Sequence, residues 1–259
     1  MTIKTRILIV LVLFFAALWF LGFDFKFLFK KDLIKSTPLP AVTKKFETFS
    51  PTISSKTSFI PETGKPLIHF NVPFTSQAPF GEWSDDRQQD GCEEASVIMA
   101  MHWVRGDVSI TREEAKKEIL AISDWEQEKY GNYHDTSAED TISRIFNKYY
   151  NYKNVRLEKN ATTDDIIKEL EKGNLVVVPV NGIALSNPHF TSPGPERHML
   201  VVIGYDYSKN EFISNDPGTS FGKDYRYAKN TLFNALRDYS TGSHSPIIGV
   251  NKNMIVVEK

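Results

Sequence analysis

The pattern of hydrophobic and polar residues divides the chain into three parts. Residues 7–23 form an uninterrupted run of 17 residues without a charged side chain. As a helix rising about 1.5 Å per residue, this run would span roughly 25 Å, which is short but sufficient for a bilayer core. Residues 32–66 are rich in Pro, Ser, Thr and Lys and lack any helical or alternating period, which is typical of a linker. Residues 67–259 are therefore predicted to form the folded domain.

The apolar run gives residues 1–31 the character of a membrane anchor. It ends in Gly22-Phe23-Asp24-Phe25, which offers no small-residue cleavage site of the kind found in signal peptides. We therefore interpret it as an uncleaved, single-pass transmembrane helix. Basic residues flank the run on both sides, so the positive-inside rule does not assign its orientation. The short N-terminal tail ahead of a large domain favours an extracytoplasmic location for that domain.

The first half of the domain is predicted to be mainly helical, after a short strand at 68–74 and a polar, aromatic loop at 76–90. Thr111 and Glu114 have the spacing of a capping box, and Gly173 stands where helices commonly end. Helices are expected over four ranges: 93–104, 112–122, 137–149 and 164–172.

The second half of the domain is predicted to be strand-rich. Residues 175–180 and 199–204 are nearly continuous apolar runs, which is typical of buried strands. A shorter strand is expected at 212–214, and residues 247–257 could supply one or two more. Helices followed by strands indicate an α+β fold.

Composition and charge exclude several classes of function. The chain has 31 basic and 32 acidic side chains, so it lacks the excess of Lys and Arg that nucleic-acid binding requires. A single cysteine excludes an intramolecular disulfide. The acidic residues Asp85, Asp86 and Asp90 do not fit a common cation-binding loop, and the six histidines show no ligand spacing. We therefore expect neither a metal nor a cofactor, and the sequence leaves the oligomeric state open.

The single cysteine, Cys92, occupies an unusual electrostatic position. It precedes the apolar face of the helix expected over 93–104, and the tight entry Asp90-Gly91 places it at that helix's first turn. Unpaired N–H groups at a helix N-terminus stabilise a thiolate and can also bind an oxyanion. This position favours a nucleophile over a structural cysteine buried in the core.

A thiolate nucleophile needs a base, and His198 stands at the start of the strand that continues into 199–204. Asp216 closes the next expected strand. A cysteine at a helix N-terminus, a histidine on a strand and a carboxylate on the following strand correspond to the nucleophile, base and orienting group of a catalytic triad.

Asp206 is nearer to His198 in sequence than Asp216 is, but strand geometry excludes it. Eight residues at about 3.3 Å each place Asp206 roughly 26 Å away, at the far end of the same strand. A turn at 208–210 then reverses the chain.

The register across this turn decides which side chain meets His198. If Tyr205 pairs with Glu211, Asp216 lies opposite Leu200, on the same face as His198. The β-carbons of Asp216 and His198 would then be about 7–8 Å apart. A slip of one residue would place Asn215 there instead.

These segments resemble the C-39-like peptidase family, whose best-known relatives are bacteriocin-processing peptidases that cleave after double-glycine leaders. The similarity covers roughly residues 67–224. It implies a papain-like cysteine peptidase fold, with the nucleophile at a helix N-terminus and a C-terminal antiparallel sheet, and it implies Cys92, His198 and Asp216 as the triad. The matching segments are Val72–Gln77, Gly91–Ser96, His198–Tyr205 and Asn215–Gly218.

The same resemblance implies that Gln77 donates a hydrogen bond to the oxyanion. Gln88 and Gln89, in the long loop before Cys92, compete for that role. The family usually has Gly-Pro after the cysteine, whereas this chain has Glu93-Glu94. Two carboxylates beside a thiolate oppose its ionisation, so either they point away from the sulfur or the thiol depends heavily on His198.

The sequence therefore predicts a membrane-anchored cysteine peptidase or amidohydrolase acting on a peptide or protein through a thioester. The alternative is a catalytically silent module of the same fold that binds a peptide or a cell-wall glycopeptide at the surface. The two acidic residues after Cys92 are the main support for this alternative.

The anchor makes a prediction about the mature protein. If residues 7–23 are an uncleaved transmembrane helix, Met1 or Thr2 is retained and the protein stays with membranes after a high-salt wash. N-terminal sequencing of the washed membrane fraction checks this. Soluble protein beginning between Phe23 and Lys35 would show a cleaved signal peptide instead.

Overall fold

A computed structural model describes residues 64–259, which belong to a compact unit assigned to Thr57–Lys259. The expected anchor over residues 1–31 and almost all of the linker over 32–66 lie outside the described residues. From residue 64 onward, the structure contains no helix that is both long and apolar enough to cross a bilayer.

In the described part, a mainly helical first half is followed by a strand-rich second half. Its helices are α2 (Asp86–Gln89), α3 (Cys92–Arg105), α4 (Arg112–Tyr130), α5 (Ala138–Asp140), the π-helix η2 (Thr141–Tyr149), α6 (Thr163–Glu171), α7 (Gly182–Leu185) and α8 (Lys229–Ala235). Its strands are β1 (Ile68–His69), β2 (Val155–Glu158), β3 (Leu175–Val180), β4 (His198–Asp206), β5 (Glu211–Asn215), β6 (Tyr225–Ala228) and β7 (Met254–Val257).

The strands form one sheet in the order β2-β7-β3-β4-β5-β6, with β1 added at one end of β4. Every strand pairing in it is antiparallel. β3 and β4 are buried along their whole length. This agrees with their nearly continuous apolar sequences, because a strand covered on both faces has no polar side to alternate with.

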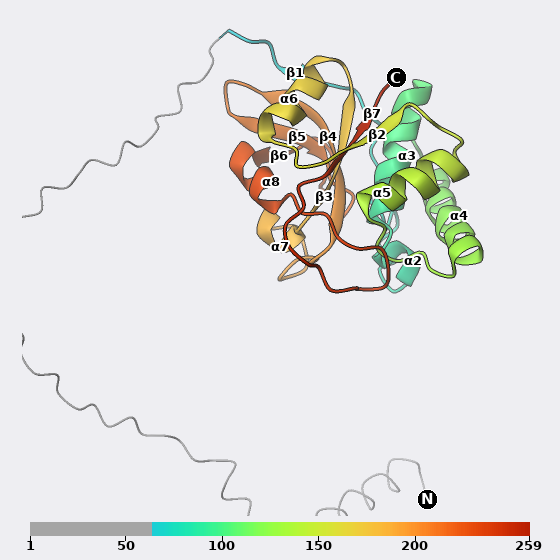
Figure 1. Ribbon diagram of the computed structural model, residues 1–259. Helices are drawn as coiled ribbons and strands as arrows, with labels where there is room; N and C mark the ends of the chain where they lie inside the picture. Colours follow the sequence, from blue (N-terminus) through green and yellow to red (C-terminus); the bar gives the residue numbers. More distant parts are fainter. Residues whose placement is uncertain (1–63) are drawn as a thin grey trace, which may run out of the picture. The chain divides into compact units, whose positions relative to one another are not determined.

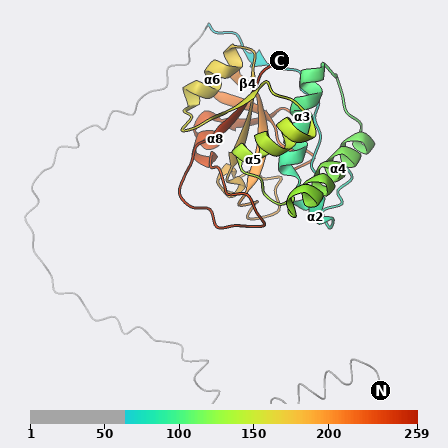
Figure 2. The same cartoon turned by 45° about the vertical axis from the view of Figure 1, so that its right-hand side comes forward.

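Helices cover both faces of this sheet, and each face has its own hydrophobic core (Figures 1 and 2). Helices α3, α4 and η2 contribute to the core on one face. Helices α6, α7 and α8 contribute to the core on the other. The period of two along each strand explains this division, since Val177 and Met199 point to the first core while Val178 and Leu200 point to the second.

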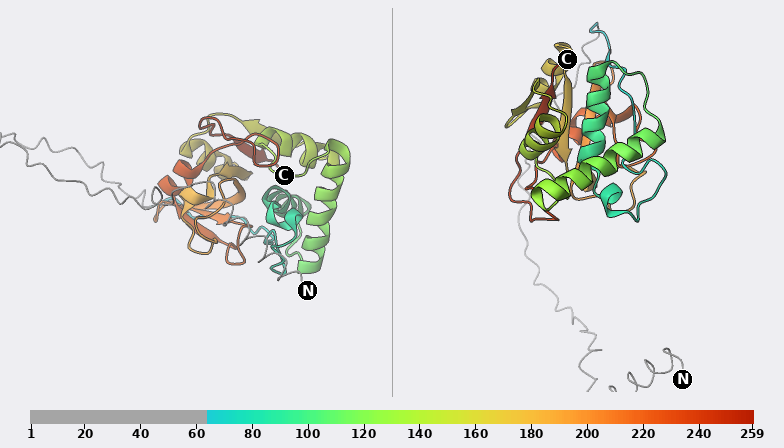
Figure 3. Two further views of the ribbon diagram at one scale, coloured as in Figure 1. Left: turned by 90° about the horizontal axis from the view of Figure 1, so that it is seen from below. Right: turned by 90° about the vertical axis from the view of Figure 1, so that its right-hand side faces the viewer.

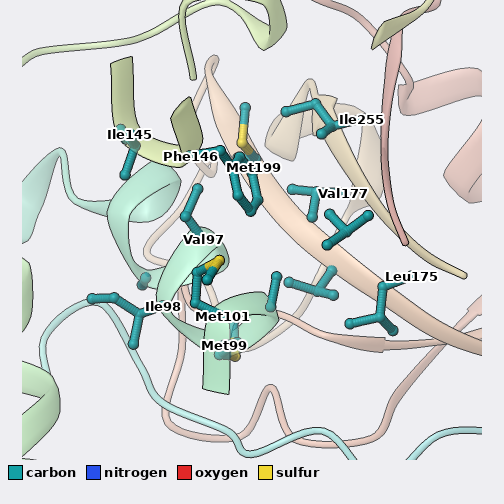
Figure 4. Packing of buried hydrophobic residues seen from close by; sticks show 14 of the residues in the cluster. Val97, Ile98, Met99, Met101, Ile145, Phe146, Leu175, Val177, Met199 and Ile255 are labelled. Atoms are coloured by element: carbon teal, nitrogen blue, oxygen red, sulfur yellow. The ribbon is translucent and has the colours of Figure 1, made fainter. Parts of the chain in front are cut away.

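Helix α3 lies between the sheet and α4, so it is almost entirely enclosed (Figure 3). Val97, Met101 and Phe146 pack near Met199 and Val177 of the sheet (Figure 4). The hydroxyl of Ser96 also donates to the Met199 carbonyl at 3.1 Å. The packing and this hydrogen bond together hold the N-terminal part of α3 beside the first residues of β4.

The predicted helices are confirmed with changes at their ends. The Thr111 capping box begins α4, which continues to Tyr130 and ends at Gly131 in the left-handed conformation. Thr162 caps α6, and its reciprocal partner is Asp165. The helix expected over 137–149 is present, but it divides into α5 and the π-helix η2.

The strand predictions were less complete. The strand expected at 68–74 is limited to β1, and residues 247–257 supply only β7. Strands β2 and β6 were missed, because neither is fully buried on one face and their sequences lack a long apolar run. The α+β class and the antiparallel sheet are confirmed.

The register between β4 and β5 contains a β-bulge. The prediction that Tyr205 pairs with Glu211 was wrong, since Tyr205 pairs with Phe212. An irregularity between Val202 and Gly204 then shifts the pairing by one residue, as bulges do, and Val201 lies opposite Asn215. At the start of β4 and the end of β5, the register is therefore the one expected from the sequence.

Gly204 provides a stability test of this part of the sheet. A β-carbon at Gly204 would lie 2.2 Å from the Ile68 carbonyl oxygen, so Gly204→Ala must displace β1 from β4. We expect it to lower the free energy of unfolding by about 1–3 kcal/mol, the usual cost of overpacking. Urea denaturation measures this. In a chain beginning at Phe70, which lacks β1, the same substitution should be nearly silent; an equal loss there would refute the explanation.

Candidate active site

Cys92 is the first residue of α3, directly after the N-cap Gly91. The chain enters the helix tightly, because a β-carbon at Gly91 would lie 2.6 Å from the Arg87 carbonyl oxygen. Cys92 is only 5% exposed and belongs to the hydrophobic core on the α3 face. The expectation that it would stand clear of the apolar face was therefore wrong, although it also lines a cavity.

His198 is the first residue of β4 and is buried. Its Nε2 lies 2.7 Å from Oδ1 of Asp216, and Phe190 packs edge-on against the ring with centroids 5.4 Å apart. Because Asp216 engages Nε2, Nδ1 is the ring nitrogen left to exchange a proton.

Asp216 is completely buried, and hydrogen bonds satisfy both of its carboxylate oxygens. Oδ1 accepts from the Gly218 backbone N–H at 3.0 Å in addition to its contact with His198, and Oδ2 accepts from the Tyr227 hydroxyl at 2.6 Å. Burial alone would raise the pKa of Asp216, but His198, Tyr227 and the Gly218 N–H together lower that pKa below its usual value. The carboxylate thus stays ionised and fixed in orientation.

The competing residues have other partners. Asp206 lies at the opposite end of β4, where it accepts from Ser208 and pairs with Arg226. The hydrogen bond from Ser208, opposed by burial and aided by Arg226, lowers the Asp206 pKa to about 2. Asn215 donates to the Val72 carbonyl at 3.1 Å and accepts from a backbone N–H at 3.1 Å. Neither side chain contacts His198.

Cys92 and His198 line the same cavity, which has a volume of about 1100 Å³. Gln77 and Gln89 also line it, as does Trp83, which the sequence suggested as part of a substrate groove. The other walls come from the loop before β4, the loop after β5 and the segment before β7. These contribute His189, Phe190, Thr191, Gly194, Pro195, Glu196, Arg197, Gly218, Thr219, Ser220, Phe221, His244, Pro246 and Ile247.

The side-chain amide of Gln77 is held by backbone carbonyls. Nε2 donates to the carbonyls of Gln88 at 3.1 Å and Gln89 at 2.8 Å. Within residues 64–259, its buried Oε1 has no hydrogen-bond partner. Gln77 and Gln89 therefore line the cavity, Gln88 is buried, and Gln77 is the side chain that fixes the turn before α3.

The two acidic residues after Cys92 are both buried but point in different directions. The Cys92 thiol donates to Oε2 of Glu93 at 3.0 Å, so Glu93 faces the sulfur. Oε1 of Glu94 instead accepts from the Ser123 hydroxyl at 3.0 Å. Burial, followed by the Glu93 charge and its hydrogen bond, raises the pKa of the Cys92 thiol well above its usual value. This arrangement keeps the thiol protonated.

Sequence reasoning missed two tyrosines at this site. Tyr227 on β6 contacts Asp216, and Tyr239, after α8, donates to Oε1 of Glu93 at 2.6 Å. The alternation Tyr225-Arg226-Tyr227 is a strand signal that could have identified β6. Nothing in the local sequence distinguishes Tyr239, since only the fold brings it to α3.

No group of three or more His, Cys, Asp or Glu side chains in the described part of the chain is arranged to hold a metal ion.

Comparison with known proteins gives one clear match. The model of the Peptidase_C39 like family matches residues 69–243, which include all four predicted site residues. Among solved structures, the chain is similar to a candidate C39-like peptidase from Bacillus anthracis, at 14% identity and a TM-score of 0.46. That alignment covers 75% of this chain and 99% of the other. No curated protein matches the chain.

The contact between His198 and Asp216 predicts a measurable effect on the thiol. We expect Asp216→Ala to slow alkylation of Cys92 by iodoacetamide severalfold or more, because His198 then lacks the carboxylate that orients it as a base. The matched control Asp206→Ala should leave the rate nearly unchanged, because Asp206 contacts the turn after β4. Equal rates for Asp216→Ala and the parent protein, with both folded by circular dichroism, would contradict the assignment.

Proposed function

The chain belongs to the Peptidase_C39 like family, and we propose that it is a papain-like cysteine peptidase or amidohydrolase. The single observation that carries this proposal is that Cys92 and the hydrogen-bonded pair His198–Asp216 meet at one cavity. A buried, ionised carboxylate that orients a histidine at the cavity that a thiol also lines is consistent with nucleophilic catalysis by cysteine.

The reaction uses these groups in sequence. Nδ1 of His198 takes the thiol proton, and Sγ of Cys92 attacks the carbonyl carbon of the scissile amide. The tetrahedral intermediate collapses when the imidazolium returns the proton to the leaving amine, which departs and leaves a thioester on Cys92. His198 then deprotonates a water molecule, which hydrolyses the thioester and restores the thiol.

Gln77 and the backbone N–H of Cys92 would bind the oxyanion. The first N–H groups of a helix have no partner within it, so the Cys92 N–H is suited to this role. Both protons of the Gln77 amide donate to backbone carbonyls, at 3.1 Å to Gln88 and 2.8 Å to Gln89. The whole amide would have to rotate and exchange one of these bonds for the bond to the oxyanion.

The cavity is suited to a peptide or protein substrate. Its volume of about 1100 Å³ exceeds what a single amino-acid side chain needs. Trp83 and Phe221 on its rim are partly exposed and supply apolar surface that a peptide can cover. With the expected anchor over residues 1–31, we propose that the enzyme acts from the membrane on extracytoplasmic peptides.

One observation favours a second candidate, a binding module without catalytic activity. Glu93 accepts the Cys92 thiol hydrogen and holds the thiol protonated, which opposes formation of the nucleophile. If this state persists, the same cavity would only hold a peptide or glycopeptide.

Cleavage of a peptide library separates the two candidates. We expect the domain over residues 57–259 to cleave a subset of peptides, and Cys92→Ser to lose that cleavage while still binding the same peptides. Binding without cleavage by the parent protein at every pH would establish the binding module instead. Cleavage retained by Cys92→Ser would exclude Cys92 as the nucleophile.

The oxyanion assignment makes a separate prediction. Gln77→Ala should lower kcat by about 100-fold or more, the usual effect of losing one oxyanion donor. Gln89→Ala keeps the backbone carbonyl that Gln77 contacts, so it is the matched control and should change kcat little. A large loss in Gln89→Ala with none in Gln77→Ala would reverse the assignment.

A further inference from the structure

Glu93 is a buried acid that the proposed mechanism does not use. It is 2% exposed, although it lies in the first turn of α3 beside the nucleophile. Oε2 accepts the hydrogen of the Cys92 thiol at 3.0 Å, and Oε1 accepts from the Tyr239 hydroxyl at 2.6 Å. Each carboxylate oxygen therefore has one defined partner.

Tyr239 holds this contact from a rigid segment. The chain after α8 is fixed to β3 through the Arg237 N–H, which donates to the Pro179 carbonyl at 3.0 Å. The neighbouring Asp238 N–H donates to the Asn251 carbonyl at 2.8 Å. With Tyr239 itself buried, Glu93 cannot turn away from the sulfur without leaving the tyrosine hydroxyl unsatisfied.

The charges around Glu93 come from several elements. Asp135, in the segment between α4 and α5, and Glu126 of α4 are electrostatically coupled to it. Arg197 pairs with Asp135 at 3.5 Å, and Arg144 of η2 lies 4.0 Å from Glu126. Other titratable groups that interact with Glu93 are Cys92 and Glu94 on its own helix and Tyr239 after α8.

We propose that Glu93 is a positioning residue that gates the nucleophile by its own protonation. As a carboxylate it holds the thiol hydrogen on Sγ and keeps Cys92 unreactive. As a neutral carboxylic acid it releases that hydrogen to His198. The inference rests on the proposed function, because it concerns the same thiol.

The protons balance in both states. With Glu93 ionised, one proton stays on Sγ and is shared with Oε2, so that proton does not pass to His198. When Glu93 takes a proton from solvent, its negative charge beside the sulfur is removed. The thiol proton can then pass to Nδ1 of His198, which gives the thiolate–imidazolium pair that attacks substrate.

The environment places this titration near neutral pH. Burial and the Asp135 charge raise the pKa of Glu93, while the hydrogen bonds from Tyr239 and Cys92 lower it, and the balance is about 7. The carboxylate therefore forms as the pH rises through this value. Reactivity of Cys92 should accordingly fall between mildly acidic and mildly alkaline pH, the opposite of an ordinary thiol.

The test is the rate of Cys92 alkylation by iodoacetamide across roughly pH 5 to 9, a range that spans the raised pKa of Glu93. In the parent protein we expect the rate to fall as pH rises through neutrality. Glu93→Gln should abolish this fall and raise the rate at pH 8 by about tenfold or more, since removing one adjacent charge shifts a pKa by about one unit or more.

Two further variants keep the test specific. Tyr239→Phe removes a hydrogen bond that favours the Glu93 carboxylate, so the fall in rate should move to higher pH. Glu94→Gln is the matched control at the next position: Oε1 of Glu94 accepts from the Ser123 hydroxyl and not from the Cys92 thiol, so the fall in rate should remain.

The outcomes distinguish this inference from the proposed function. A fall in rate that is unchanged in Glu93→Gln, or no shift in Tyr239→Phe with the protein folded, would overturn the gate while leaving Cys92 a reactive nucleophile. A parent protein whose Cys92 reacts no faster than free cysteine at any pH would overturn the proposed function itself.

Discussion

The buried carboxylate of Asp216 is the constraint on which the rest of the site depends. An ionised group without exposure to water is tolerated only when its oxygens are fully hydrogen-bonded, because an unpaired buried charge costs several kcal/mol. Here the partners come from three places: His198 at the start of β4, Tyr227 on β6 and the Gly218 backbone. Meeting that requirement fixes β4, β5 and β6 relative to one another and holds the imidazole in one orientation.

The proposed nucleophile, Cys92, is positioned by a separate contact. The Ser96 hydroxyl joins the N-terminal part of α3 to the Met199 carbonyl, one residue after His198. The hydrophobic core around α3 supports this join, and the enclosed helix leaves Cys92 at the boundary between core and cavity. The hydrogen-bonded carboxylate of Asp216 positions the histidine, and the apolar packing around α3 positions the thiol. Both groups therefore lie at one cavity. Neither requirement depends on Glu93, which acts on the thiol from within α3.

The sequence predicted the parts of this arrangement that depend on local chemistry. Capping by Thr111 and Thr162, the buried strands β3 and β4 and the helix that begins at Cys92 all follow from short-range patterns. The contact of His198 with Asp216 also followed from strand alternation, although the bulge near Gly204 was needed to restore the register. What the sequence could not show was long-range: the contact of Tyr227 with Asp216 and the approach of Tyr239 to Glu93. Those contacts arise only when distant segments pack around α3 and β4.

The central claim is that Cys92 forms a covalent bond with the substrate. Mass spectrometry of protein quenched with acid during turnover of a cleaved peptide tests it most directly. The account predicts a Cys92 that carries the acyl half of the peptide as a thioester, and loss of this adduct in His198→Ala. Turnover with Cys92 unmodified throughout would contradict it, because hydrolysis would then proceed without the proposed nucleophile.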